Sequence, residues 1–194
     1  MKPTPGKGNP GYLDGEKKKK RLLLAAFVLV IAALLITASV VGGTAGGFIR
    51  MAGVLMVIPA ANTLVNVIAM APYRSGDGAL AARAAEVSGG CRVLSELVIT
   101  NTDGPSVSVP CAVIGEGAAV VYMRCPADRE KAVKLPTPGQ FGTYLERRMR
   151  ISELELTVTA VREEEAFLAE AAKLTPAEPE WEARVASALL ANSF

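Results

Sequence analysis

Residues 17–41 read KKKKRLLLAAFVLVIAALLITASVV, five cationic residues followed by twenty that are almost all apolar. A glycine-rich break over residues 42–47 separates this stretch from a second apolar one, residues 48–71. A bilayer core about 30 Å thick needs about 20 apolar residues in a helix that rises about 1.5 Å per residue. The sequence therefore predicts a transmembrane helical hairpin over residues 22–71, with spans 22–41 and 48–71.

The cationic block predicts how the hairpin is oriented. Positively charged residues beside a span tend to stay in the cytoplasm, and two spans return the chain to the side from which it started. We therefore expect a multi-pass protein of the cell membrane with both termini in the cytoplasm. The same cations are candidates for contact with anionic lipid head groups, each contributing about 1 kcal/mol. They are Lys17, Lys18, Lys19, Lys20 and Arg21.

The residues before the first span are rich in glycine, proline and lysine and contain few apolar side chains. Such a composition buries too little apolar surface to offset the entropy of ordering the chain. We therefore expect a disordered basic N-terminal tail over residues 1–21.

Three residues of the second span depart from its apolar character. Pro59 is expected to kink the helix, while Asn62 and Asn66 are four residues apart and share a face. Amides in hydrocarbon are costly unless they find hydrogen-bonding partners. One interpretation is intramembrane packing, in which the amides bond to the first span or to another copy of the chain. The alternative is a substrate path through an oligomer.

Residues 75–194 are expected to form a cytosolic α+β domain with a mixed sheet and the element order α-β-β-β-α-β-α-α. The strands are expected over residues 92–100, 106–114, 118–124 and 153–160. The third has a near-continuous apolar run, which is typical of a strand buried on both faces. The fourth alternates apolar and polar residues from Glu153 to Ala160, which places one face in the core. Pro110 cannot donate to a ladder, so it marks an edge or an irregular point of the second strand.

Composition removes several kinds of chemistry. The chain has no histidine, which excludes serine–histidine and cysteine–histidine nucleophile pairs and histidine-ligated zinc. Its three cysteines, Cys91, Cys111 and Cys125, have no metal-binding spacing, and we interpret them as reduced, buried thiols. Residues 75–194 hold seventeen acidic and twelve basic side chains, which disfavours nucleic acid as a partner. We therefore assign no catalytic, cofactor-binding or metal-binding residue, and expect no cofactor.

The order α-β-β-β-α-β resembles the core of the restriction-endonuclease-like nucleases. In that family a Pro-Asp pair opens the second strand and an acidic-x-Lys motif lies on the third, and their carboxylates hold Mg²⁺. Here the corresponding residues are Pro110-Cys111 and the run from Val120 to Arg124, which contains no carboxylate. The resemblance implies at most a degenerate relative of such a fold.

Three short segments carry a second resemblance, over nearly the whole chain. They are Gly8-Asn9-Pro10-Gly11-Tyr12, Pro72-Tyr73-Arg74 and Leu94-Ser95-Glu96-Leu97-Val98-Ile99-Thr100. In these segments the chain resembles a family of small two-span membrane proteins of Gram-positive anaerobic bacteria. This resemblance implies no activity and no site residues.

Three functional hypotheses follow. The first is a membrane-anchored, cytosol-facing interaction or scaffold module, with the bilayer and a protein partner or a second copy as its partners. The second is an enzyme at the membrane surface, which rests on the cysteines and on carboxylates such as Glu96 and Glu116. The third is a small transporter subunit, in which Asn62 and Asn66 line the path.

Overall fold

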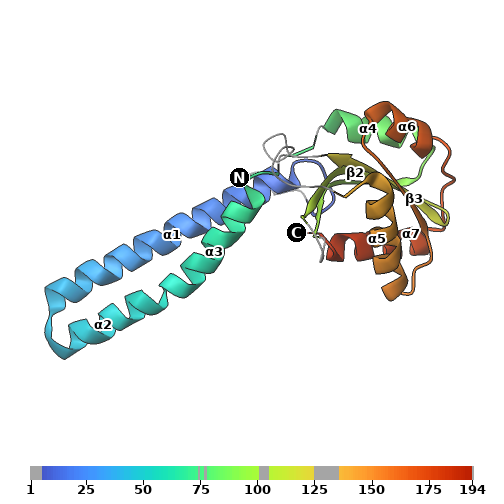
Figure 1. Ribbon diagram of the computed structural model, residues 1–194. Helices are drawn as coiled ribbons and strands as arrows, with labels where there is room; N and C mark the ends of the chain where they lie inside the picture. The colour runs from blue at the N-terminus through green and yellow to red at the C-terminus, as the bar shows by residue number, and fades with distance from the viewer. Residues whose placement is uncertain (1–5, 74, 77, 101–104, 125–135, 194) are drawn as a thin grey trace. The chain divides into compact units, whose positions relative to one another are not determined.

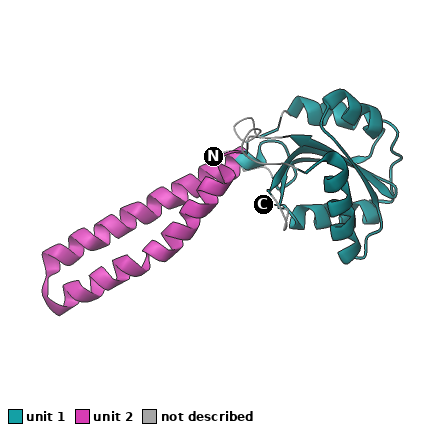
Figure 2. Ribbon diagram, viewed as in Figure 1, with its two compact units in different colours: residues 1–13, 73–194 teal, residues 14–72 magenta. Residues whose placement is uncertain are grey.

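The computed structural model describes residues 6–73, 75–76, 78–100, 105–124 and 136–193. The chain forms two compact units, which Figure 2 shows in different colours. The first, here called the domain, consists of residues 1–13 and 73–194. The second, here called the hairpin, consists of residues 14–72.

The hairpin is built from α1 (Tyr12–Val41), which begins in the domain, α2 (Gly43–Leu55) and α3 (Val57–Met70). Only Gly42 separates α1 from α2, so the break is much shorter than the expected loop over residues 42–47. Gly42 and Gly43 both have positive φ angles, of 64° and 58°. Because glycine adopts this conformation without steric cost, two residues reverse the chain and the rest of the glycine-rich segment is helical.

The structure also differs from the expected disordered tail over residues 1–21. Residues 6–11 are described and pack on the domain, and α1 is already helical at Tyr12. The cationic residues Lys17–Arg21 therefore lie within a continuous helix. Composition favoured disorder because this segment contains few apolar side chains. Composition does not reveal that the first turn of α1 finds hydrogen-bond acceptors in the domain.

The two arms of the hairpin meet along a seam with a heptad spacing. In each arm a row of buried and half-buried positions recurs at alternating intervals of three and four residues, and Asn66 and Ala69 are half-buried beside this row. This spacing is typical of two helices that cross at a small angle, with the side chains of one fitting between those of the other. Gly46, Gly53 and Ala60 let the arms approach closely. The seam residues are Lys20, Leu24, Phe27, Ile31, Leu34 and Ala38 in α1, and Gly46, Ile49, Gly53, Met56, Ala60, Thr63, Val67 and Met70 in the returning arm.

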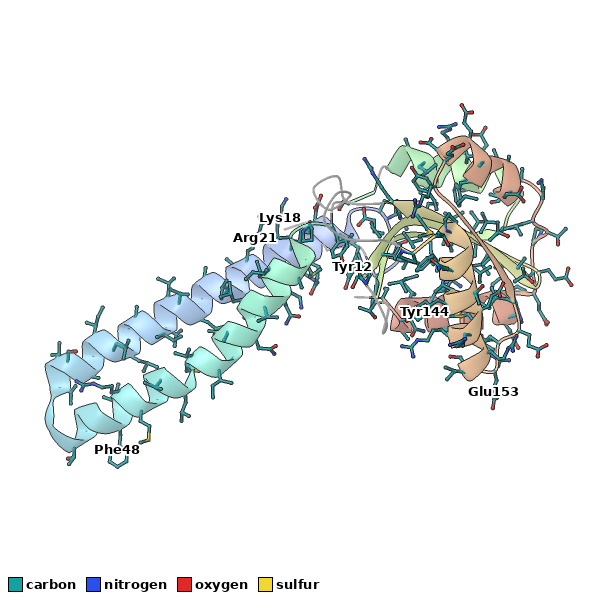
Figure 3. The ribbon with its side chains drawn as sticks, viewed as in Figure 1. Tyr12, Lys18, Arg21, Phe48, Tyr144 and Glu153 are labelled. Atoms are coloured by element: carbon teal, nitrogen blue, oxygen red, sulfur yellow. The ribbon has the colours of Figure 1, made fainter. Side chains whose placement is uncertain are left out.

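Outside the seam, both arms expose large apolar side chains. Leu29 is 70% exposed, Val40 81% and Phe48 76%, and Phe48 projects away from the hairpin in Figure 3. The stretches Tyr12–Val41 and Gly43–Met70 are each long and apolar enough to cross a membrane. In the most apolar 18 residues of each stretch, only 6% and 11% are buried, respectively. The core helix of a soluble protein would be mostly buried, so the hairpin differs from one in this respect.

Irregularity in the returning arm lies close to Pro59. The helix is interrupted at Met56, one turn before the proline. Proline lacks the N–H that would bond to the carbonyl four residues earlier, and its ring crowds that carbonyl. Asn66 donates its side-chain amide to the Asn62 carbonyl at 3.0 Å, and the Thr63 hydroxyl donates to the Pro59 carbonyl at 2.9 Å. These polar groups therefore bond within their own helix.

The domain confirms the expected α+β class and element order. Its elements are α4 (Gly78–Val87), β1 (Arg92–Ile99), β2 (Val107–Gly115), β3 (Ala118–Arg124), α5 (Pro138–Ile151), β4 (Thr157–Val161), α6 (Glu164–Ala171) and α7 (Pro179–Ala191). The strands form one mixed sheet in the order β1-β2-β3-β4, and only the pair β3–β4 is parallel. The crossover through α5 makes that parallel pairing possible.

Helices cover both faces of the sheet. Figure 1 shows α4 and α6 on one face and α5 and α7 on the other. Leu80 of α4 and Phe167 of α6 pack with Cys111, Val113 and Val120 on the first face. The opposite face holds the larger cluster, which includes residues of α5 and α7. Since β3 contributes to both clusters, it is buried on both faces, as its apolar run predicts.

The fourth strand is shorter than predicted. We expected it over residues 153–160, but β4 begins at Thr157. Thr157 pairs with Ala118, the first residue of β3, so the residues before Thr157 have no neighbouring strand. The alternation itself is confirmed, because Leu154, Leu156 and Val158 are buried and the residues between them are exposed.

Candidate functional site

Glu96 is the most unusual residue of the domain. It lies in β1, its exposed fraction is only 3%, and its φ angle is 59°. Carboxylates are seldom fully buried without partners, and a non-glycine residue with positive φ is strained. Both features indicate that the surrounding structure holds this side chain in place.

The Glu96 carboxylate accepts hydrogen bonds from two segments that are distant in sequence. The Gly11 N–H donates to Oε1 at 2.6 Å, and the Leu13 N–H donates to Oε2 at 2.8 Å. The Ser75 hydroxyl donates to Oε2 at 3.4 Å. We call this set of contacts the Glu96 clamp. It holds the chain where it enters α1 and where it returns after α3.

Helix α1 gives the clamp its physical basis. The first N–H groups of a helix have no partner within it, and the helix dipole makes this end favourable for negative charge. Residues near such an end usually supply a local cap from their own side chains. Here Gly11 has no side chain, and the cap comes from Glu96, 85 positions along the chain. Leu13, at the start of the helix, is only 2% exposed.

The segment before α1 is fixed along the edge strand β1 as well. The Ser95 N–H donates to the Gly8 carbonyl at 2.7 Å. Gly8 has a φ of 89° and lies against the side chains of Leu94 and Leu190. The Lys7 ammonium donates to the Ser193 carbonyl at 2.7 Å, and burial lowers the pKa of Lys7 below its ordinary value. An edge that would otherwise offer free backbone groups to another chain is thus occupied.

Pro110 explains why β1 can deviate at Glu96. Strands β1 and β2 pair through Ser95–Cys111 and Leu97–Val109, and the ladder skips Glu96 and Pro110 between them. The pairing of β2 with β3 also shifts its register between Ser108 and Cys111. The predicted irregular point at Pro110 is therefore confirmed, and it lies in a central strand, not at an edge. The missing proline N–H leaves the backbone at Glu96 free to adopt the positive φ.

The returning chain is anchored near the same place. Tyr73 is buried, and its hydroxyl donates to the Ser106 carbonyl at 3.5 Å. Arg74 lies outside the described residues. Of the segments quoted in the sequence analysis, Gly8–Tyr12 thus contacts Leu94–Ile99 within the domain, through Ser95 and Glu96.

The cysteines that motivated the enzyme hypothesis are poor nucleophiles where the structure describes them. Cys91 and Cys111 are free and buried. Burial raises the pKa of Cys111 to about 12. The pKa of Cys91 is also raised, mainly by burial and to a lesser extent by the negative charge of Glu182. Because the thiolate is the reactive form, neither thiol is activated at neutral pH. Cys125 lies outside the described residues.

The raised pKa of Cys111 predicts a loss of stability at alkaline pH. The unfolded thiol releases its proton near its ordinary pKa of 9.0, while the folded thiol keeps it up to about pH 12. The contribution of Cys111 is therefore fully present below pH 9 and falls as the pH rises, by at most about 1.4 kcal/mol per unit. Urea titrations at pH 8, 9 and 10 check this. Cys111→Ala should flatten the decline between pH 9 and 10, and an identical decline in both proteins contradicts the assignment.

The other predicted residues are dispersed. Asn62, Asn66 and Pro59 lie in α3, and Lys17–Arg21 lie in α1. Glu116 is exposed in the turn between β2 and β3. Within the described ranges, no group of three or more His, Cys, Asp or Glu side chains is arranged to hold a metal ion.

Two open hollows lie on the surface of the described part of the domain. One, of about 330 Å³, lies beside the start of β4, and its residue Glu146 already accepts the Val158 N–H at 2.9 Å. A second, of about 340 Å³, lies between the residues after α5 and helix α7. Neither collects a nucleophile with a base. The Glu96 clamp is thus the best-defined polar arrangement in the described domain, and its geometry indicates positioning of the chain.

Comparisons with known protein families, curated proteins and solved structures give no match for this chain.

Proposed function

We propose that the protein is an integral membrane protein whose hairpin crosses the bilayer twice and whose domain is a cytosolic interaction or scaffold module. The exposed apolar surface of the hairpin is the observation that carries this proposal. In water, side chains such as Leu29, Val40 and Phe48 would form a large apolar patch, which soluble monomers rarely expose. In lipid they are solvated, and every backbone polar group of a helix is satisfied internally.

The Glu96 clamp supports the role of an anchored module. It binds Gly11, Leu13 and Ser75, so the domain holds the chain on both sides of the hairpin. We infer that the clamp keeps these segments ordered on the domain, which lowers the entropy lost when a partner binds there.

Membrane topology provides the first test. We expect the full chain to remain in the membrane pellet at alkaline pH, and a C-terminal fluorescent protein fused to it to fluoresce in the cytoplasm. Gly47→Cys, at the far end of the hairpin, should react with an impermeant maleimide added to intact cells. Its side chain has room there, since no atom lies within 4 Å of the added Cβ. Release of the chain from the pellet, or labelling only after lysis, contradicts the proposed insertion.

The module hypothesis is tested by affinity capture of a C-terminally tagged chain from detergent-solubilised native membranes. A partner recovered in a fixed ratio supports the hypothesis, and loss of that partner in a Glu96→Ala chain that stays in the membrane links it to the clamp. Recovery of the chain without other proteins contradicts the hypothesis of a scaffold for other proteins.

A further inference from the structure

The exposed side of the returning arm carries a second heptad seam. Opposite the residues that contact α1, side chains again recur at intervals of three and four. Phe48, Met51, Leu55, Ile58 and Val65 in this row are each between 60% and 76% exposed. Asn62 is exposed in the same row, between Ile58 and Val65. We call this row the outer seam. It has the spacing of an interhelical interface but no partner within the described chain.

Asn62 is the only residue in the outer seam with a polar side chain, and that side chain has no partner among the described residues. Its backbone carbonyl accepts the Asn66 amide, but among the described residues its own side-chain amide makes no hydrogen bond. This distinguishes Asn62 from Thr63 and Ser39, whose hydroxyls bond to carbonyls of their own helices. The residue therefore keeps the full hydrogen-bonding capacity of a primary amide on an otherwise apolar surface.

The depth of Asn62 excludes lipid head groups as its partner in the proposed orientation. Ten positions separate it from Pro72, the last residue of the hairpin. At about 1.5 Å per residue, this distance is about 15 Å, half the thickness of a bilayer core of about 30 Å. An unpaired amide at that depth is strongly disfavoured. A hydrogen-bonding group on another transmembrane helix would satisfy this amide.

We propose that the partner is a second copy of this chain, which packs outer seam against outer seam and pairs the two Asn62 side chains. This inference rests on the membrane insertion proposed above. Copies inserted in the same orientation place their α3 helices parallel, and a two-fold axis brings each residue of the seam next to its own counterpart. An amide is self-complementary because it both donates and accepts. One buried asparagine in an apolar heptad seam also fixes register and favours a dimer.

The experiment uses the full chain in lipid vesicles, labelled at its C-terminus with a donor or an acceptor fluorophore. Energy transfer is measured as the protein is diluted with lipid. We expect Asn62→Leu to raise the dissociation constant of the dimer about 10-fold, within the range of interhelical hydrogen bonds in membranes. Asn62→Gln keeps the amide and should retain most of the dimer. Asn66→Leu is the matched control and should dissociate like the native chain, because the Asn66 amide is bonded within its own helix.

Disulfide trapping tests the geometry independently. In a chain carrying Cys125→Ser, we expect Leu55→Cys to form disulfide-linked dimers in vesicles upon oxidation. Val57→Cys, at nearly the same depth but on the other side of the helix, should not. Absence of transfer in the native chain, or equal dissociation constants for the native chain and Asn62→Leu, overturns the inference while membrane insertion stands. A chain that fails to enter vesicles instead contradicts the proposed function, and the dimer with it.

Discussion

Replacing Glu96 by alanine is expected to lower the free energy of unfolding of the domain by about 3 kcal/mol. The substitution removes both acceptors of the Gly11 and Leu13 N–H groups, and each buried donor left unpaired costs about 1–3 kcal/mol. Alanine does not relieve the backbone strain, because its Cβ keeps the positive φ unfavourable. Urea unfolding followed by the fluorescence of Trp181, the only tryptophan of the chain, measures the change.

The clamp also predicts a local effect that a general loss of stability would not produce. In Glu96→Ala, hydrogen exchange should accelerate first at the amides of Gly11 and Leu13, before exchange in β2 and β3 changes. Glu96→Gln should give an intermediate result, because a side-chain amide keeps one oxygen acceptor and places its NH₂ group against the other donor. Glu116→Ala, in an exposed turn, is the control and should stay within about 0.5 kcal/mol of the native protein. Unchanged exchange at Gly11 and Leu13 would show that Glu96 does not cap α1.

The sequence predicted those parts of the fold that depend on local patterns. The run from Ala118 to Arg124 matched β3 residue for residue, because a strand buried on both faces is apolar over most of its length. The alternation from Glu153 to Ala160 predicted the correct buried face. It placed the start of the strand four residues before Thr157, where β4 begins. Alternation depends on which side faces the core, whereas the start of a strand depends on where its neighbour begins.

The site could not be predicted because its contacts are long-range. Residues 1–21 contain little apolar surface, so their composition favoured disorder, yet Leu13 is buried and its N–H finds an acceptor 83 positions away. In the sequence, Glu96 supported the hypothesis of an enzyme at the membrane surface, and no structural role was predicted for it. The one local signal was Pro110, which predicted an irregular ladder without revealing that Glu96 lies opposite it. A polar residue in a strand next to such an irregularity could have suggested a structural role.

The other large expected effect concerns the contact between α5 and the edge strand β4. A Cβ atom at Gly142 would lie 2.6 Å from the Val158 carbonyl oxygen, closer than real Cβ atoms approach backbone. Glu146, one turn later in α5, accepts the Val158 N–H at 2.9 Å. Helix α5 therefore covers the backbone of the strand at Val158, which protects this edge of the sheet from pairing with other chains.

Gly142→Ala is therefore expected to lower the free energy of unfolding by about 1–3 kcal/mol, because overpacking forces the helix or the strand to shift. Gly139→Ala is the matched control in the same helix, since no atom lies within 4 Å of its added Cβ. Alanine has the higher helix propensity, so this control should be neutral or stabilised by up to about 1 kcal/mol. In urea unfolding, the same chemical change should thus destabilise the protein at Gly142 but not at Gly139, three residues away. If Gly142→Ala were as stable as Gly139→Ala, α5 could not lie against Val158 as described. Gly142→Ala could also aggregate more readily than the native protein. Loss of the cover over the edge of β4 would explain this aggregation, because a shift of α5 exposes the Val158 N–H to another chain.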